Sequence, residues 1–121
     1  RKLGGCETGD AKITTGGRLK AQYVIHTVGP VYRDGKHGEP DLLARCHRRS
    51  LEVALDNALK TIAFPAISCG VYGYPIPEAA HIAVSTVKSF LESHEGIVLV
   101  RFVLFGAHTG QAFDAALSRL A

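Results

Sequence analysis

The segment 64–75, Phe-Pro-Ala-Ile-Ser-Cys-Gly-Val-Tyr-Gly-Tyr-Pro, holds the residue types best suited to binding a ligand. Gly70 and Gly73 let the backbone approach a ligand closely, and consecutive N–H groups in such a loop can point at phosphate oxygens. Tyr72 and Tyr74 offer flat surfaces for a sugar or a base. A glycine-rich connection with two surface tyrosines fits the same residues equally well, so the residues alone leave both interpretations open.

Cys69 lies in this segment, where a nucleophile could stand. A cysteine phosphatase clamps phosphate with an arginine six positions after the cysteine, and that position holds Pro75. The Gly-x-Ser-x-Gly motif of serine hydrolases is absent, because Ala66 stands two positions before Ser68. We therefore interpret Cys69 as a small packing residue.

The six histidines show neither HExxH nor another metal-ligand spacing, and no P-loop or GxGxxG motif is present. We expect no metal and no cofactor. His26 lies in an apolar strand pattern and is interpreted as a hydrogen-bonded core histidine. His47 groups with Arg45, Arg48 and Arg49, which we assign to the solvated face of a helix.

Composition indicates one ordinary globular domain of 121 residues, 46% of them hydrophobic and 21% charged. The net charge of +3 is scattered, which suits a small anionic ligand better than a nucleic acid. No apolar run reaches the roughly 18 residues of a membrane span, and no secretory h-region is present, so we expect a soluble protein with no membrane partner. Three cysteines without CxxC spacing indicate a reducing, cytoplasmic location.

Hydrophobic spacing predicts alternating strands and helices that position the 64–75 segment. The segment leaves a short apolar strand, expected to be central and buried on both faces, and enters a helix whose N-terminus favours an anion. The order predicts an α/β fold with a largely parallel sheet, whose carboxyl edge is where such folds bind ligands. The expected strands are Lys12–Thr14, Tyr23–Val28, Thr61–Phe64 and Ile97–Phe105, and the expected helices are Pro40–Leu59, Pro77–Ser93 and Gln111–Leu120.

Three blocks, Gly5–Thr14, Tyr23–Pro30 and Ala63–Pro75, together resemble the macrodomain family, and most closely its branch of O-acetyl-ADP-ribose deacetylases and mono-ADP-ribosyl hydrolases. The resemblance covers essentially the whole chain. It implies a three-layer α/β/α sandwich with a mixed, largely parallel sheet. It also implies that residues 1–121 are a single, amino-terminally truncated macrodomain.

The resemblance implies that the loop wraps the diphosphate and distal ribose of ADP-ribose with its backbone. Tyr72 would flank the distal ribose, and Phe105 would reach the adenine end. Cys69 departs from the family, which commonly has Thr there. The ligand-binding residues expected from the resemblance are Ser68, Cys69, Gly70, Val71, Tyr72, Gly73, Tyr74 and Phe105.

The family's first two strands, its Asn-Ala-Ala-Asn segment, its Gly-rich loop and the helix that follows have no counterpart in the sequence, and we expect upstream chain that supplies them. In the family, that part carries the adenine-binding acid and the residues linked to hydrolysis, so no catalytic residue is assigned. Three functions stay open: a parent protein that hydrolyses O-acetyl-ADP-ribose or mono-ADP-ribosyl linkages, a reader of ADP-ribose or of ADP-ribosylated protein, and an inactive fragment.

Overall fold

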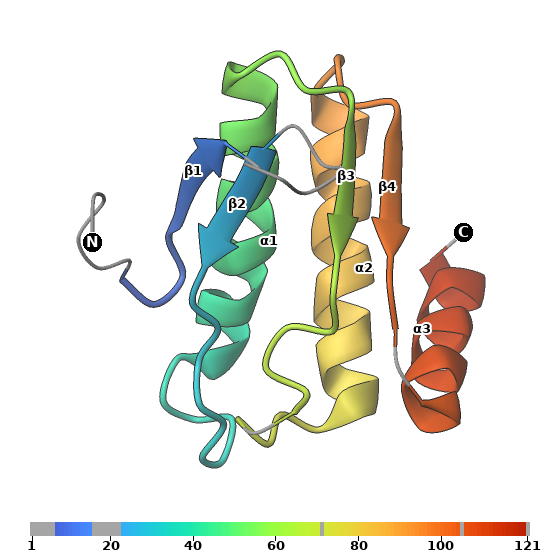
Figure 1. The fold of residues 1–121 in the computed structure, drawn as a ribbon. Coiled ribbons are helices and arrows are strands. Elements are labelled where there is room, and N and C mark those ends of the chain that lie inside the picture. The colour runs from blue at the N-terminus through green and yellow to red at the C-terminus, as the bar shows by residue number, and fades with distance from the viewer. Residues whose placement is uncertain (1–6, 16–22, 71, 105, 121) are drawn as a thin grey trace.

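Strands and helices alternate along the chain in the computed structural model, which describes residues 7–15, 23–70, 72–104 and 106–120 (Figure 1). The strands are β1 (Ala11–Thr15), β2 (Tyr23–Thr27), β3 (Thr61–Phe64) and β4 (Leu99–Phe102). The helices are α1 (Glu39–Asp56), α2 (Ile76–Ser93) and α3 (Ala107–Leu120). The predicted α/β alternation is confirmed, and every expected element is present among the described residues.

The described strands form two separate two-stranded sheets. β1 and β2 are antiparallel, with Ile13 opposite Ile25, whereas β3 and β4 are parallel, with Ile62 opposite Val100. The mixture of strand directions agrees with the expectation. The expectation of one sheet is not met in the described part of the chain, where no hydrogen-bonded ladder joins β2 to β3 and a cavity lies between them.

Both sheets lie against one layer formed by α1 and α2, and α3 packs beside α2 next to β4 (Figure 1). The helices begin at the end of the molecule where β2, β3 and β4 finish (Figure 1). The N-termini of the helices and the carboxyl ends of these strands therefore share one edge, as in other open α/β folds.

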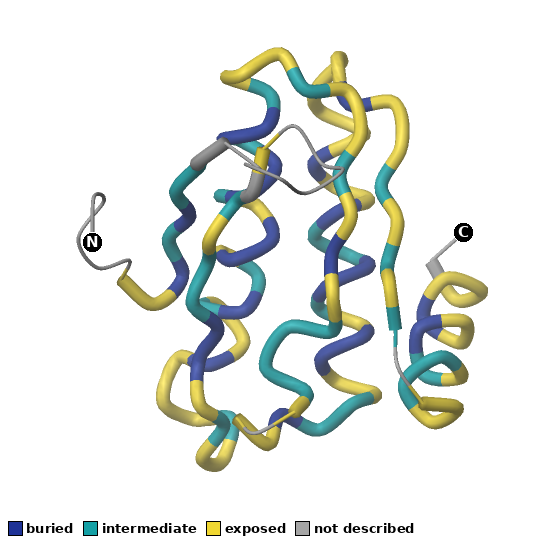
Figure 2. Tube along the Cα trace, in the orientation of Figure 1, coloured by how far each residue is buried: buried dark blue, intermediate teal, exposed yellow. Residues whose placement is uncertain are grey.

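Buried residues recur along α1 and α2 on the turns that face the strands (Figure 2). The main cluster joins Leu51 and Ala54 of α1 to Phe64 of β3 and Phe90 of α2. A second cluster joins α2 to α3 through small residues around the ring of Phe113, so that the two helices lie close together; its buried members are Ala80, Ala83, Val84, Phe113 and Ala116.

Two expectations about histidine burial are wrong. His47 is only 1% exposed, with Nδ1 2.9 Å from the carbonyl oxygen of Leu43 and its ring 5.0 Å from that of Phe64. It lies on the inward face of α1 because it belongs to the same stripe as Leu43 and Leu51, whereas Arg45 faces solvent. His26, expected in the core, is exposed on β2, because its neighbours Ile25 and Thr27 take the inward positions.

The ends of the regular elements differ modestly from the predicted ranges. β4 stops at Phe102, three residues before the expected end, because its partner β3 is only four residues long. α3 begins at Ala107 instead of Gln111. Gly106 makes the preceding turn with φ 86°, and the N–H of Gly110 donates to the carbonyl oxygen of Gly106, which closes the first turn of the helix. β3 is not buried on both faces: Thr61 and Ala63 are exposed.

None of the described helices is both long enough and apolar enough to cross a membrane.

Replacing Leu51 by alanine tests the main cluster. Leu51 is fully buried between helix and sheet, so Leu51→Ala should lower the free energy of unfolding by about 2–5 kcal/mol. Leu117→Ala, at a leucine of α3 that is 48% exposed, is the matched control and should change it by less than about 0.5 kcal/mol. Urea denaturation followed by circular dichroism measures both, and equal effects would contradict the assignment of the core.

Candidate functional site

The candidate site lies where the loops after β2 and β3 meet. A cavity of about 1350 Å³ runs along the space between these strands, and Gly29, Ser68 and Tyr72 line it at the carboxyl end. The segment singled out in the sequence thus opens onto this cavity. Pockets of this kind at the carboxyl edge of an α/β sheet are the usual place for a ligand.

Gly29 allows the two loops to touch. A Cβ at this position would lie 2.2 Å from Ser68 Oγ and 2.6 Å from Ile67 Cγ2, so any larger residue would force the loops apart. The Ser68 hydroxyl donates to the carbonyl oxygen of Pro30 over 2.8 Å, and the Tyr32 N–H donates to that of Tyr72 over 3.0 Å. These contacts fasten the loop after β3 to the loop after β2.

Three N–H groups of the loop after β3 are used inside the loop itself. Cys69 donates to Ala66, Gly73 to Gly70, and Tyr74 to Ser68, over 3.3, 2.9 and 2.9 Å. The turn requires positive φ values of 66° at Ser68 and 72° at Gly73. The loop therefore has a fixed shape before any ligand arrives.

The N–H groups of Gly70 and Tyr72 are among the donors of this loop that bond to no other backbone group within the residues that the structure describes. A Cβ added at Gly70 would meet nothing within 4 Å, so the backbone there faces open space. Two N–H groups beside open space form a site that an anion can approach closely.

The two tyrosines of the loop have different environments. Tyr72 is 39% exposed and lines the cavity, so its ring can lie beside a ligand. Tyr74 is 2% exposed, with its ring centre 4.8 Å from that of Tyr32 in an edge-to-face contact, so the expectation of an open ring surface is wrong for Tyr74. Burial, together with the nearby charge of Glu78, raises the pKa of Tyr74 to about 12. Its ring packs on Leu43 and leaves only its backbone to the site.

Cys69 is half-buried against the cluster that contains Leu43 and Tyr74, and burial raises the pKa of its thiol. A raised pKa keeps the thiol protonated at neutral pH, which agrees with a packing role and not with a nucleophile. Two other residues predicted for the site, Val71 and Phe105, lie outside the described residues.

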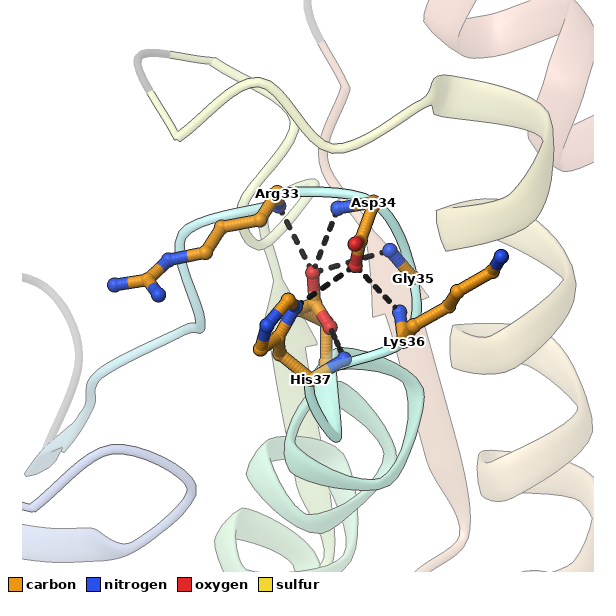
Figure 3. Close-up of polar contacts among 6 residues, drawn as sticks. Arg33, Asp34, Gly35, Lys36 and His37 are labelled. Atoms are coloured by element: carbon orange, nitrogen blue, oxygen red, sulfur yellow. Dashed lines mark hydrogen bonds and ion pairs between the residues drawn. The ribbon is translucent and has the colours of Figure 1, made fainter.

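A buried carboxylate that the sequence analysis missed shapes the loop between β2 and α1. Glu39 is 2% exposed and is the first residue of α1. Four backbone N–H groups of the preceding loop donate to it: those of Arg33, Asp34 and Gly35 to Oε2 over 2.8, 3.1 and 3.1 Å, and that of His37 to Oε1 over 2.6 Å (Figure 3). The signal in the sequence is an acid between Gly38 and Pro40, at the start of a helix.

Asp34, His37 and Glu39 lie close enough to suggest a metal site, since their ligand atoms are within 4.8 Å of one another. The bonding of Glu39 argues for a different role, because four N–H groups already point at its two oxygens. Asp34 likewise accepts the N–H of Lys36 over 2.8 Å. The cluster anchors the loop, and we assign no metal to it.

The hydrogen bonds to Glu39 lower its pKa. Burial by itself would raise it, but the backbone N–H groups of Arg33, His37 and Asp34 favour the ionised form and hold the pKa at about 2. The ionised carboxylate is therefore the state that stabilises the loop.

Glu39 should make the stability of the protein depend on pH in acid. The pKa of Glu39 is about 2 in the folded chain against an ordinary value of 4.5, so its stabilisation is fully present above about pH 4.5 and is lost as the pH falls towards 2. Glu39→Gln should lower the melting temperature at pH 7 by several degrees and should approach the parent protein at pH 2. Thermal denaturation at several pH values measures this.

The control for this test is Glu92→Gln, because Glu92 is an exposed carboxylate on α2, 3.7 Å from Lys88. It should leave both the melting temperature and its pH dependence nearly unchanged. A Glu39→Gln curve parallel to that of the parent protein would show that the four N–H bonds do not favour the charged carboxylate.

A family model and several known proteins are similar to this chain in sequence. Residues 1–83 match the Macro domain family model. A macro domain-containing protein of Chlorobaculum tepidum is 52% identical over 118 residues, which are 98% of this chain and 69% of the relative. An O-acetyl-ADP-ribose deacetylase of Escherichia fergusonii is 46% identical over 119 residues, 98% of this chain and 67% of that protein.

Solved structures are similar over nearly the whole chain. The Oceanobacillus iheyensis macrodomain with ADP superposes with a TM-score of 0.89 at 41% identity, covering 94% of this chain and 60% of that one. The Trypanosoma brucei macrodomain in complex with ADP-ribose gives 0.85 at 39% identity, covering 93% and 47%. The chain thus spans about two thirds of these curated relatives and about half to three fifths of these solved chains.

Proposed function

The chain belongs to the macrodomain family, and we propose that it binds ADP-ribose where the loops after β2 and β3 meet. Membership and the macrodomain-like α/β fold, both expected from the sequence blocks, are confirmed by the family match and by the superpositions on solved macrodomains. Two of those solved relatives hold ADP or ADP-ribose. The ligand of this chain is inferred from them and from its own loop.

The observation that carries the proposal is the open backbone at Gly70. Its N–H and that of Tyr72 bond to no backbone group among the described residues, and a Cβ at Gly70 would meet nothing within 4 Å, so a phosphate group can approach the backbone there. The N-terminus of α2 follows within the same edge of the fold and favours negative charge, although Glu78 in its first turn partly opposes that effect. The chain's net charge of +3 also favours an anionic ligand.

The sugar and the base would extend from this diphosphate site into the cavity. The exposed ring of Tyr72 is placed to flank the distal ribose, and Ser68 and Gly29 form the floor beside it. Contacts of Val71 with the ligand and of Phe105 with adenine stay predictions. We extend the proposal to ADP-ribosylated proteins as partners. We also propose a reducing cytoplasm as the location, which the free thiol of Cys69 supports.

Gly70→Glu tests the proposed diphosphate site. The substitution places a side chain and a negative charge where the phosphates must lie, so calorimetric titration with ADP-ribose should show at least a hundredfold loss of affinity. Ser89→Glu makes a similar change of charge at an exposed position near the far end of α2 and should bind as the parent chain does. Unchanged affinity in a folded Gly70→Glu protein would remove this loop from the site.

A second candidate function is hydrolysis of an ADP-ribose derivative, favoured by the Escherichia fergusonii relative, whose name is that of a deacetylase. The described residues of this chain include none that we assign to catalysis, since Cys69 is half-buried with a raised thiol pKa and Glu39 is fully engaged by N–H groups. We therefore propose that these 121 residues bind and that turnover needs further macrodomain sequence.

Acetate release from O-acetyl-ADP-ribose separates binding from turnover. The 121-residue chain should release none above background and should bind ADP-ribose more weakly than the full-length Escherichia fergusonii relative. The relative has the part of the domain that carries the family's adenine-binding acid. Two or three hydrogen bonds from that part correspond to about 2–5 kcal/mol of binding free energy, or roughly one and a half to nearly four decades in Kd. Fusing the unmatched part of that relative to this chain should restore both properties. Turnover by the 121 residues alone would contradict the proposal.

A further inference from the structure

The segment between β2 and α1, residues 31–38, begins beside the candidate ligand site. The Tyr32 N–H donates to the carbonyl oxygen of Tyr72 over 3.0 Å, so Arg33 directly follows a residue that is bound to the loop after β3. Tyr72 is also the residue placed to flank the distal ribose. Arg33 and Lys36 are both exposed. We call residues 31–38 the basic loop.

Contacts beneath the basic loop fix its backbone. Four of its N–H groups donate to the buried carboxylate of Glu39. The ring of Tyr32 packs edge-to-face on that of Tyr74, with the ring centres 4.8 Å apart. Gly35, at φ 79°, lies against Tyr32, since a Cβ added there would be 3.3 Å from the tyrosine hydroxyl oxygen. A loop held in this way loses little conformational entropy when its exposed side chains bind a partner.

Two cationic side chains of the basic loop form no ion pair within the described part of the chain. Figure 3 shows the Arg33 and Lys36 side chains extending outward to opposite sides of the loop. The ion pairs found among the described residues use other side chains. Asp34 accepts the N–H of Lys36 over 2.8 Å and lies 2.9 Å from His37 Nδ1, so this carboxylate is engaged by the backbone and by the histidine. Arg33 and Lys36 therefore present their charges to the solvent.

A protein that carries ADP-ribose is attached through the distal ribose, so the residues around the attachment would lie next to Tyr72. We propose that the basic loop binds acidic residues of such a protein, with carboxylates at Arg33 and at Lys36 on either side of the modified residue. Val31, which is 56% exposed, adds an apolar contact at the start of the loop. The inference rests on the proposed ADP-ribose site and adds the kind of sequence that the partner carries around its modification.

The distribution of charge favours a peptide over a nucleic acid. Asp34 is exposed between Arg33 and Lys36 in the sequence. Burial, and after it the charge of Glu78, raises the pKa of Tyr32, which places a further carboxylate near the basic loop. A peptide can present single carboxylates to the two cations and avoid these acids, whereas a continuous row of phosphates would be repelled by them.

Two synthetic peptides test the partner class. Each carries ADP-ribose on a central serine, and one has glutamates on both sides of it where the other has glutamines. In calorimetric titration the glutamate peptide should bind roughly two- to thirtyfold more tightly than the glutamine peptide, the effect of two exposed ion pairs. The difference should shrink at high salt, because exposed charges are screened. Free ADP-ribose should bind as the glutamine peptide does.

Two double variants locate the docking surface. Arg33→Gln with Lys36→Gln removes both charges and leaves the bonds to Glu39 in place, because those bonds use backbone N–H groups. This variant should bind the two peptides with equal affinity and should still bind free ADP-ribose. The matched control is Arg48→Gln with Lys88→Gln, which removes the same charge from exposed positions on α1 and α2 and should keep the full preference for glutamate.

Free ADP-ribose separates a failure of this inference from a failure of the proposed site. If it does not bind the parent chain, the ADP-ribose site is wrong and the inference fails with it. If it binds but the two peptides have equal affinity, or if the variant at Arg33 and Lys36 keeps the preference, only the docking surface is overturned. A single-stranded DNA with ADP-ribose on its terminal phosphate should bind less tightly than the glutamate peptide, and the reverse order would overturn the choice of partner.

Discussion

Burial of one face of α1 is the constraint on which the rest of the structure depends. This face contacts β1 and β2, packs on α2 and reaches Phe64 of β3, so it supports both sheets. Leu51 and Ala54 provide apolar area against Phe64, which places β3 over the junction of the two helices. Among the described strands no ladder joins the two small sheets, and packing on α1 and α2 holds them in a common layer.

That face of α1 explains why part of the fold could be predicted and part could not. The apolar spacing from Leu43 to Ala54 gives the helix and its inward direction, and the β-branched run at Tyr23–Thr27 gives a strand. Periodicity does not say which strands pair. The apolar run at Thr61–Phe64 is typical of a central strand, yet Thr61 and Ala63 are exposed because β3 has a neighbour on one side only among the described residues. The prediction for His47 is wrong because it follows the polar residue type, whereas the position of His47 in the same apolar stripe as Leu43 and Leu51 places its side chain inward.

The sequence predicts which loop forms the candidate site, but it does not predict the hydrogen bonds that hold this loop in shape. Glycines at 70 and 73 after an apolar strand indicate a backbone site, and the structure puts open space beside Gly70. Sequence alone could not separate Tyr72 from Tyr74, because their exposure depends on Tyr32 and Leu43, which are distant in the chain. Nor could it show that Gly29 touches Ser68 or that Glu39 gathers four N–H groups, since both depend on how the loops fold back.

The contact between the loops after β2 and β3 sets the shape of the candidate ligand site. The Ser68 hydroxyl holds the loop after β3 to Pro30, and only glycine fits at position 29, because a Cβ there would lie 2.2 Å from Ser68 Oγ. A loop that is already held in place loses less conformational entropy when a ligand binds, so this contact favours binding even where it does not touch the ligand.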